Sequence, residues 1–200
     1  MEPSQIRRVL DIVRRTGVLR ARDLSAYDIP REYLSRLLER GLLKRVGRGL
    51  YVLPDVEATE HHTLAEAGKR VPQGVVCLLS ALQFHGLTTQ APFEVWLAIE
   101  AKAWRPRVDY PPLRIVRFSG AAWESGVEEH IIEGIAVKVY SPAKTVADCF
   151  KYRNKVGLDV ALEALRDCRR QHKCTHSDLL RFAQVCRVNA VMRPYLEAIQ

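Results

Sequence analysis

The sequence predicts an α+β protein in two parts, and both the order of its elements and its charge distribution support this. Residues 1–54 have the pattern of three helices and a short hairpin, whereas residues 63–200 have strands followed by helices. The first part holds 12 of the 31 Lys and Arg residues and 6 of the 23 Asp and Glu residues, hence +6 of the net charge of +8. We therefore expect a domain over residues 1–54, a polar linker over residues 55–62 and an α+β domain over residues 63–200.

The first part begins with an amphipathic helix over residues 3–16, because aliphatic residues recur at i, i+3, i+4 and i+7 from Ile6 and a glycine follows. A short second helix is predicted over residues 20–27. The third helix begins near Pro30, since proline is favoured at the first helical position, and runs to about Arg40. Leucines occupy one side of this third helix, and polar and basic residues occupy the other.

Residues 42–54 predict a hairpin, because two β-prone runs flank a Gly-Arg-Gly turn. Three helices followed by a basic hairpin are the parts of a winged helix-turn-helix domain. In that domain the third helix enters the major groove of DNA, and the wing contacts phosphates or the minor groove. The sequence therefore predicts DNA binding, with a solvated arginine-rich surface and a protein-interaction winged helix as the alternatives.

The basic and polar side chains of this segment are the candidate DNA contacts. Eleven of its twelve basic residues are arginine, whose planar fork suits phosphates and guanine edges. Because one winged helix covers only a few base pairs, we expect a paired site or inverted repeat in double-stranded operator DNA. The candidates for base edges are Tyr33, Ser35, Arg36 and Arg40, those for phosphates are Arg20, Arg22, Lys44, Arg45 and Arg48, and Arg31 lies on the flank of the third helix.

After two helical patterns, the second part has a run of strand patterns and ends with four helical patterns. Residues 93–99 alternate apolar and other residues as a half-buried strand does, and Gly120 and Gly134 break the strands that follow. This order favours a mixed α/β domain that is not a repeated βαβ sheet. The predicted helices are 63–70, 75–84, 142–153, 157–171, 176–187 and 190–199. The predicted strands are 93–99 and two or three more within 113–118 and 131–140.

Five segments carry a more specific pattern: 47–54 (GRGLYVLP), 79–88 (LSALQFHGLT), 93–99 (FEVWLAI), 141–153 (SPAKTVADCFKYR) and 157–166 (GLDVALEALR). In this order they resemble segments of the AbiEi-family antitoxins of bacterial toxin–antitoxin systems, and together they span nearly the whole chain. The resemblance implies a winged-helix repressor of its own operon. It also implies that the second domain helps to counter a nucleotidyltransferase-type toxin.

The segment after the last strand contains a formal catalytic motif. Ser141 and Lys144 have the Ser-x-x-Lys spacing of penicillin-binding proteins and serine β-lactamases, but the companion elements of those enzymes are missing. We favour a helix N-cap for Ser141. Lys144, Asp148 and Lys151 share one helical face and predict ordinary ion pairing. With Arg153 they are an alternative charged face for a partner or for DNA.

One cluster has the ligand types of a zinc site: Cys168, His172, Cys174 and His176. Its spacing is not that of the usual paired ligands, and Cys168 falls on an apolar helical stripe. We therefore expect Cys168 in the core and expect no metal and no cofactor.

Other sequence features argue against an enzyme and against a membrane protein. The chain has no nucleotide-binding, zinc-protease or esterase motif. The alternative is a DNA-directed nuclease or nucleotidyl-transferring enzyme, in which Asp109, Glu124 and Asp148 would converge on a metal. No run approaches the ~18 apolar residues of a membrane span, and no signal peptide is visible. Five cysteines, an odd number, favour reduced thiols and a cytoplasmic location.

Overall fold

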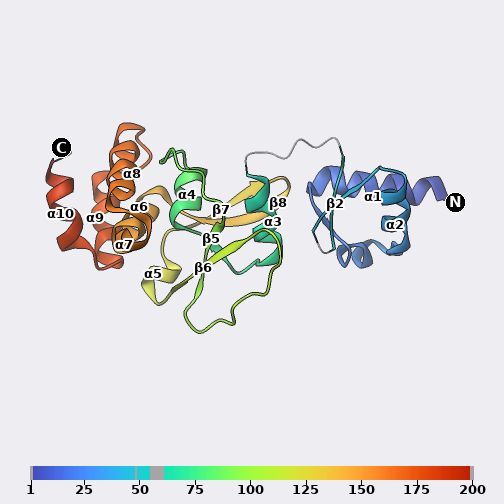
Figure 1. The fold of residues 1–200 in the computed structure, drawn as a ribbon, viewed down its shortest axis with the longest axis horizontal. Coiled ribbons are helices and arrows are strands. Elements are labelled where there is room, and N and C mark those ends of the chain that lie inside the picture. Colours follow the sequence, from blue (N-terminus) through green and yellow to red (C-terminus); the bar gives the residue numbers. More distant parts are fainter. Residues whose placement is uncertain (1, 48, 55–60, 199–200) are drawn as a thin grey trace.

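The computed structural model describes residues 2–47, 49–54 and 61–198, and its fold is mixed α and β, as predicted (Figure 1). The N-terminal segment lies at one end of the molecule, a larger sheet lies in the middle, and the last helices lie at the opposite end. Most of the linker predicted over residues 55–62 lies outside the described residues. The N-terminal elements are α1 (Glu2–Thr16), β1 (Leu19–Arg20), the 3₁₀ helix η1 (Asp23–Tyr27), α2 (Glu32–Glu39), β2 (Lys44–Gly47) and β3 (Leu50–Val52).

The N-terminal segment has the helices and hairpin expected of a winged helix, with one correction. Residues 20–27, predicted as a helix, instead contribute strand β1 and η1. Strand β1 pairs with β3, so the hairpin becomes a three-stranded sheet in the order β1-β3-β2. The backbone N–H of Arg20 donates to Asp23 Oδ2 at 3.2 Å, a local bond that competes with helix formation at this point.

The core of this segment holds α2 in place. Val9 and Val13 of α1 and Leu34 and Leu37 of α2 are almost fully buried in one cluster. The leucine stripe of the third helix therefore faces inward, as predicted, and its opposite side faces solvent.

The second part is built on a five-stranded mixed sheet with the strand order β6-β5-β4-β8-β7. Strand β4 is parallel to β8 and β5 is parallel to β6, whereas the other neighbours are antiparallel. Its elements are α3 (His62–Arg70), β4 (Val75–Val76), α4 (Leu78–Phe84), β5 (Val95–Glu100), β6 (Leu113–Phe118), α5 (Ala121–Glu124), β7 (Val127–Ile132), β8 (Ile135–Tyr140), α6 (Pro142–Lys151), α7 (Arg153–Val156), α8 (Leu158–Arg170), α9 (His176–Val185) and α10 (Asn189–Ala198).

Two predictions about this sheet were wrong. The helix predicted over residues 75–84 is interrupted, because Val75 and Val76 form the central strand β4 and only α4 is helical. Strand β5, predicted to be half-buried, is buried on both faces from Val95 to Ile99. Its alternate residues enter two different cores, with Trp96 in one and Leu97 in the other.

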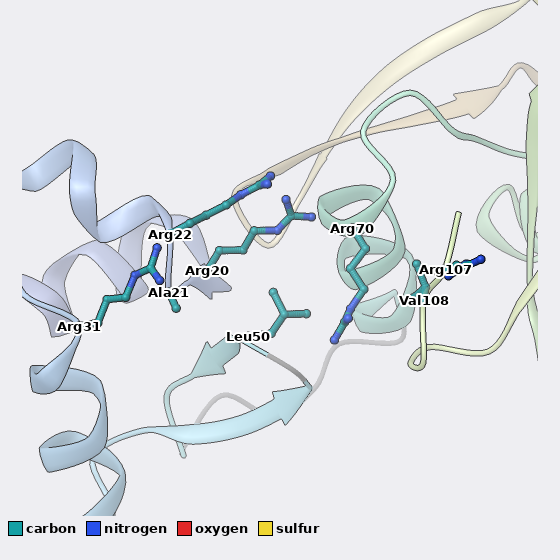
Figure 2. A pocket seen from close by; sticks show the side chains of 9 residues that line it. Arg20, Ala21, Arg22, Arg31, Leu50, Arg70, Arg107 and Val108 are labelled. Carbon is teal, nitrogen blue, oxygen red and sulfur yellow. The ribbon is translucent and has the colours of Figure 1, made fainter. Parts of the chain in front are cut away.

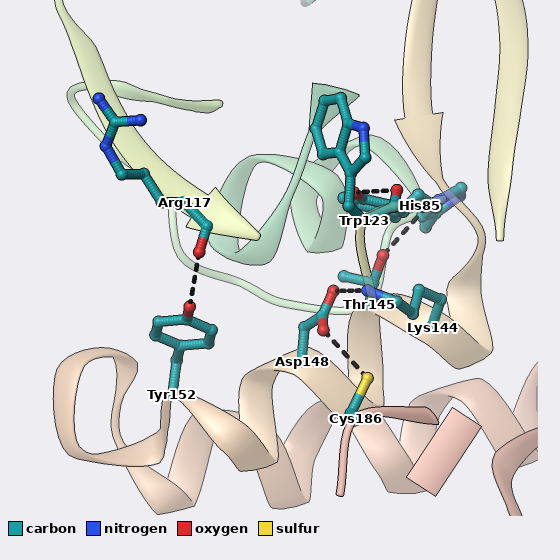
Figure 3. Close-up of polar contacts among 9 residues, drawn as sticks. His85, Arg117, Trp123, Lys144, Thr145, Asp148, Tyr152 and Cys186 are labelled. Atoms are coloured by element: carbon teal, nitrogen blue, oxygen red, sulfur yellow. Dashed lines mark hydrogen bonds and ion pairs between the residues drawn. The ribbon is translucent and has the colours of Figure 1, made fainter. Parts of the chain in front are cut away.

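The C-terminal helices follow the predicted order, but their first polar pair is buried rather than exposed. Lys144 Nζ lies 2.6 Å from Asp148 Oδ2, and the two side chains are 0% and 1% exposed (Figure 3). Lys144 Nζ also lies 4.1 Å from the centroid of the Tyr140 ring, and Cys186 Sγ donates to Asp148 Oδ1 at 3.2 Å. The prediction of a charged face formed by Lys144, Asp148, Lys151 and Arg153 is therefore wrong. Residues from β8 and the last helices cover Lys144 and Asp148.

Two smaller expectations for these helices also change. Ser141 is the N-cap residue of α6, but its hydroxyl makes no capping hydrogen bond. Cys168 is in the core, as predicted, yet it is joined to Cys174 by a disulfide. The turn after α8 brings the two Cα atoms to 6.0 Å, so the expectation of reduced thiols is wrong for this pair. Cys77, Cys149 and Cys186 are free and buried.

A second set of contacts joins the N-terminal segment to the sheet. Lys69 Nζ, in the last turn of α3, donates to the Val18 carbonyl at 2.7 Å and lies 2.8 Å from Asp23 Oδ2. Gly17 has a φ of +67°, and a side chain there would collide with the Glu133 carbonyl at the β7–β8 turn. Val18, Leu50 and Val52 are buried in the same cluster as residues of α3 and β8. The N-terminal segment is thus packed against α3 and the β7–β8 hairpin.

Breaking the buried pair should be strongly destabilising. In Lys144→Met the Asp148 carboxylate loses its partner, so we expect the free energy of unfolding to fall by about 3–5 kcal/mol in urea titrations. In Lys144→Met/Asp148→Leu both charges are gone, and most of that loss should be recovered. If the double variant is as unstable as Lys144→Met, the loss of stability does not come from an unpaired Asp148 carboxylate.

The same single variant should depend on pH in a defined direction. Burial raises the pKa of Asp148 above its usual range, an effect that the charge of Lys144 opposes. An acid whose pKa is raised in the folded state costs stability as pH rises through its unfolded-state pKa. The stability deficit of Lys144→Met relative to the wild type should therefore be smaller at about pH 5 than at about pH 8.

The Lys69 contacts predict a smaller effect, confined to the junction. Lys69→Met keeps the aliphatic stem but removes both bonds, and it should lower the free energy of unfolding by about 1 kcal/mol. Lys102→Met, an equal change of charge on an exposed turn after β5, is the matched control and should change stability little. Equal effects of the two variants would show that Lys69 does not hold the junction.

Candidate nucleic-acid interface

The outward side of α2 carries the side chains predicted to meet base edges. Ser35, Arg36 and Arg40 are exposed, and Tyr33 is half-buried on the flank. The Arg36 guanidinium lies 5.6 Å from the centroid of the Tyr33 ring, a cation–π arrangement that restricts where the guanidinium can point. The exposed Glu32 and Glu39 share this side of the helix and reduce its charge.

Strand β2 adds two basic side chains. Lys44 and Arg45 are exposed, and Arg45 Nε donates to the Gly47 carbonyl at 3.1 Å. The pairing of β2 with β3 shifts by one residue between Arg45 and Gly47, so the strand is irregular beside its turn. Arg48, predicted at the tip of the hairpin, lies outside the described residues.

Three other residues predicted to contact DNA lie away from the outer side of α2. Arg20, Arg22 and Arg31 instead line a cavity of about 330 Å³ beside β3 and α3, and we name this the arginine cavity (Figure 2). Two arginines that the sequence analysis did not single out line it too. These are Arg70, in the last turn of α3, and Arg107, in the loop between β5 and β6.

The arginine cavity is strongly electropositive. The pKa of Arg20 is lowered, first by burial and then by the charge of Arg22, with a further contribution from Arg70. Asp23 opposes this shift, but its own carboxylate also pairs with Lys69. Burial tends to raise the pKa of Asp23, yet the hydrogen bond and charge of Lys69, together with the backbone N–H and charge of Arg20, outweigh burial and hold it below its usual range. The Asp23 carboxylate is therefore shared between Arg20 and Lys69, a cation outside the cavity.

The acids of the alternative enzyme hypothesis lie in different environments. Asp148 is buried against Lys144, whereas Asp109 and Glu124 are exposed in the β5–β6 loop and in α5. Among the residues that the structure describes, there is no group of three or more His, Cys, Asp and Glu side chains placed to hold a metal. In the same part of the chain, no helix is both long and apolar enough to cross a bilayer.

Comparisons with known proteins agree with this picture of the N-terminal segment. Residues 7–54 match the family model described as a transcriptional regulator, AbiEi antitoxin. The crystal structure of the RV2827C protein from Mycobacterium tuberculosis has a TM-score of 0.62 at 14% identity, over 99% of this chain and 82% of that one. At this identity the likeness shows a shared fold. A search of curated proteins finds no match. The resemblance to the AbiEi antitoxins is thus confirmed over residues 7–54, the segment that matches this family of transcriptional regulators.

Proposed function

We propose that this antitoxin-type regulator represses transcription by binding operator DNA through residues 1–54. The observation that carries the proposal is the exposed side of α2, where Arg36 and Arg40 project from a helix whose leucines are fixed in the core. This segment is also the one that matches a family of transcriptional regulators.

In this mechanism α2 lies in the major groove and the sheet follows the DNA backbone. Arg36 and Arg40 present planar donor forks to guanine edges, and Ser35 and Tyr33 offer hydroxyl groups to bases. Lys44 and Arg45 on β2 would neutralise phosphates, and Arg20, Arg22 and Arg48 are the other phosphate contacts that the sequence predicts. Because one such domain spans only a few base pairs, two copies would bind an inverted repeat.

The division of the chain forms part of the proposal. Residues 1–54 would bind DNA, residues 55–62 would link the two parts, and residues 63–200 would help to counter a nucleotidyltransferase-type toxin in the cytoplasm. The family match supports a regulator with a toxin partner, and the toxin class comes from the resemblance of the longer segments.

The test is binding of the full chain to the DNA upstream of its own gene, measured by fluorescence anisotropy. We expect Arg36→Glu to weaken binding at least tenfold, because it places a negative charge at the base edges. Arg166→Glu, an equal charge reversal on an exposed position of α8, is the control and should bind as the wild type does. If both variants bind like the wild type, α2 is not the recognition helix.

Salt dependence tests the electrostatic part separately. With about five phosphate contacts, log K should fall with log [salt] at a slope of about −4 to −5. A slope near zero would contradict phosphate contacts by these arginines.

A further inference from the structure

We propose that the arginine cavity is a binding site for a phosphate group. The inference goes beyond the proposed function, because it depends on Arg70 of α3, outside the winged helix, and does not require DNA to be the ligand.

The lining of the cavity supplies the first argument. Arg20, Arg22 and Arg31 enter from the winged-helix side, and Arg70 enters from α3 on the opposite side (Figure 2). No acidic side chain lines the cavity among the residues that the structure describes. Its volume of about 330 Å³ is within the range of ~300–1,000 Å³ that is typical of small-ligand sites.

The surroundings of Arg70 supply the second argument. Its Nε and Nη2 atoms are shielded from solvent and have no hydrogen-bond partner among the described residues. The absence of a side chain at Gly47 makes this position possible, since a Cβ there would collide with Nη2. The positive charge of a guanidinium group is delocalised over its three nitrogens. An anion in the cavity would therefore compensate the charge of Arg70 even without contacting Nε and Nη2. A partly desolvated cation whose shielded nitrogens have no hydrogen-bond partner is a costly arrangement unless such an anion binds.

The neighbouring acids supply only part of this compensation. Asp23 is paired with Lys69 at 2.8 Å, as described above. Glu66, one helical turn before Arg70, is fully buried, and both of its carboxylate oxygens lack hydrogen-bond partners among the described residues. Burial raises the pKa of Glu66, an effect that the charges of His62 and Arg70 oppose. The cavity therefore keeps an excess of positive charge.

A phosphate group matches the excess positive charge of the cavity better than a carboxylate does. A phosphate group has up to two negative charges and three acceptor oxygens, and arginine forks bind such oxygens in pairs. The group could belong to the DNA backbone or to a free phosphate-bearing small molecule, and the chemistry of recognition is the same. The experiment therefore has one arm for each source.

Both arms use the full chain with Arg70→Gln and, as the matched control, Arg166→Gln on α8. The first arm titrates inorganic pyrophosphate by calorimetry at constant ionic strength. The second arm measures the affinity for upstream DNA. We expect Arg70→Gln to weaken binding at least fivefold in one or both arms, and Arg166→Gln to match the wild type in each. Thermal melts check that both variants are folded.

The pattern of losses identifies the source of the phosphate. A loss in the first arm alone assigns the site to a free phosphate compound, a loss in the second arm alone assigns it to DNA, and a loss in both shows that either occupant is accepted. If Arg70→Gln behaves as Arg166→Gln does in both arms, the proposal is overturned. If the wild type does not bind upstream DNA at all, the proposed function fails, and the pyrophosphate arm alone decides this inference.

Discussion

The contact of Lys69 with the N-terminal segment is the interaction on which the arginine cavity depends. One ammonium group holds both the Val18 carbonyl and the Asp23 carboxylate, and these two residues flank strand β1. The contact therefore fixes the end of α3 against the winged helix. It also shares the negative charge of Asp23 between Lys69 and Arg20, so that Arg20 on one side and Arg70 on the other face a shared cavity with only partial compensation.

Much of the fold could be predicted from the sequence, because most of its elements are long enough to show a period. Helix α1 and strand β6 lie where the periodicity places them. The failures are short or depend on distant partners. Strand β4 has two residues, and its conformation comes from pairing with β5 and β8. Strand β1 is equally short and exists because β3 pairs with it, an interaction that no local pattern records.

The candidate functional residues also fall into two groups, those that helical spacing predicts and those whose surroundings depend on tertiary packing. The exposed side of α2 follows from helical spacing alone, so Arg36 and Arg40 were placed correctly as outward side chains. Spacing also put Lys144 and Asp148 on one face, but it could not show that Tyr140 and Cys186 cover that face. For the same reason Arg70 was missed. Basic residues are common in the last turn of a helix, so the sequence does not distinguish Arg70. Its shielded position results from the packing of α3 against Gly47 of the wing.

The proposed DNA-binding surface of this regulator consists of α2 and the β2–β3 hairpin. Amide hydrogen exchange of the full chain, with and without its upstream DNA, tests this directly because it locates the contact without altering any residue. We expect DNA to slow exchange in Glu32–Glu39 and in the strands Lys44–Gly47 and Leu50–Val52. Slower exchange confined to residues 61–198, with none in those elements, would contradict it.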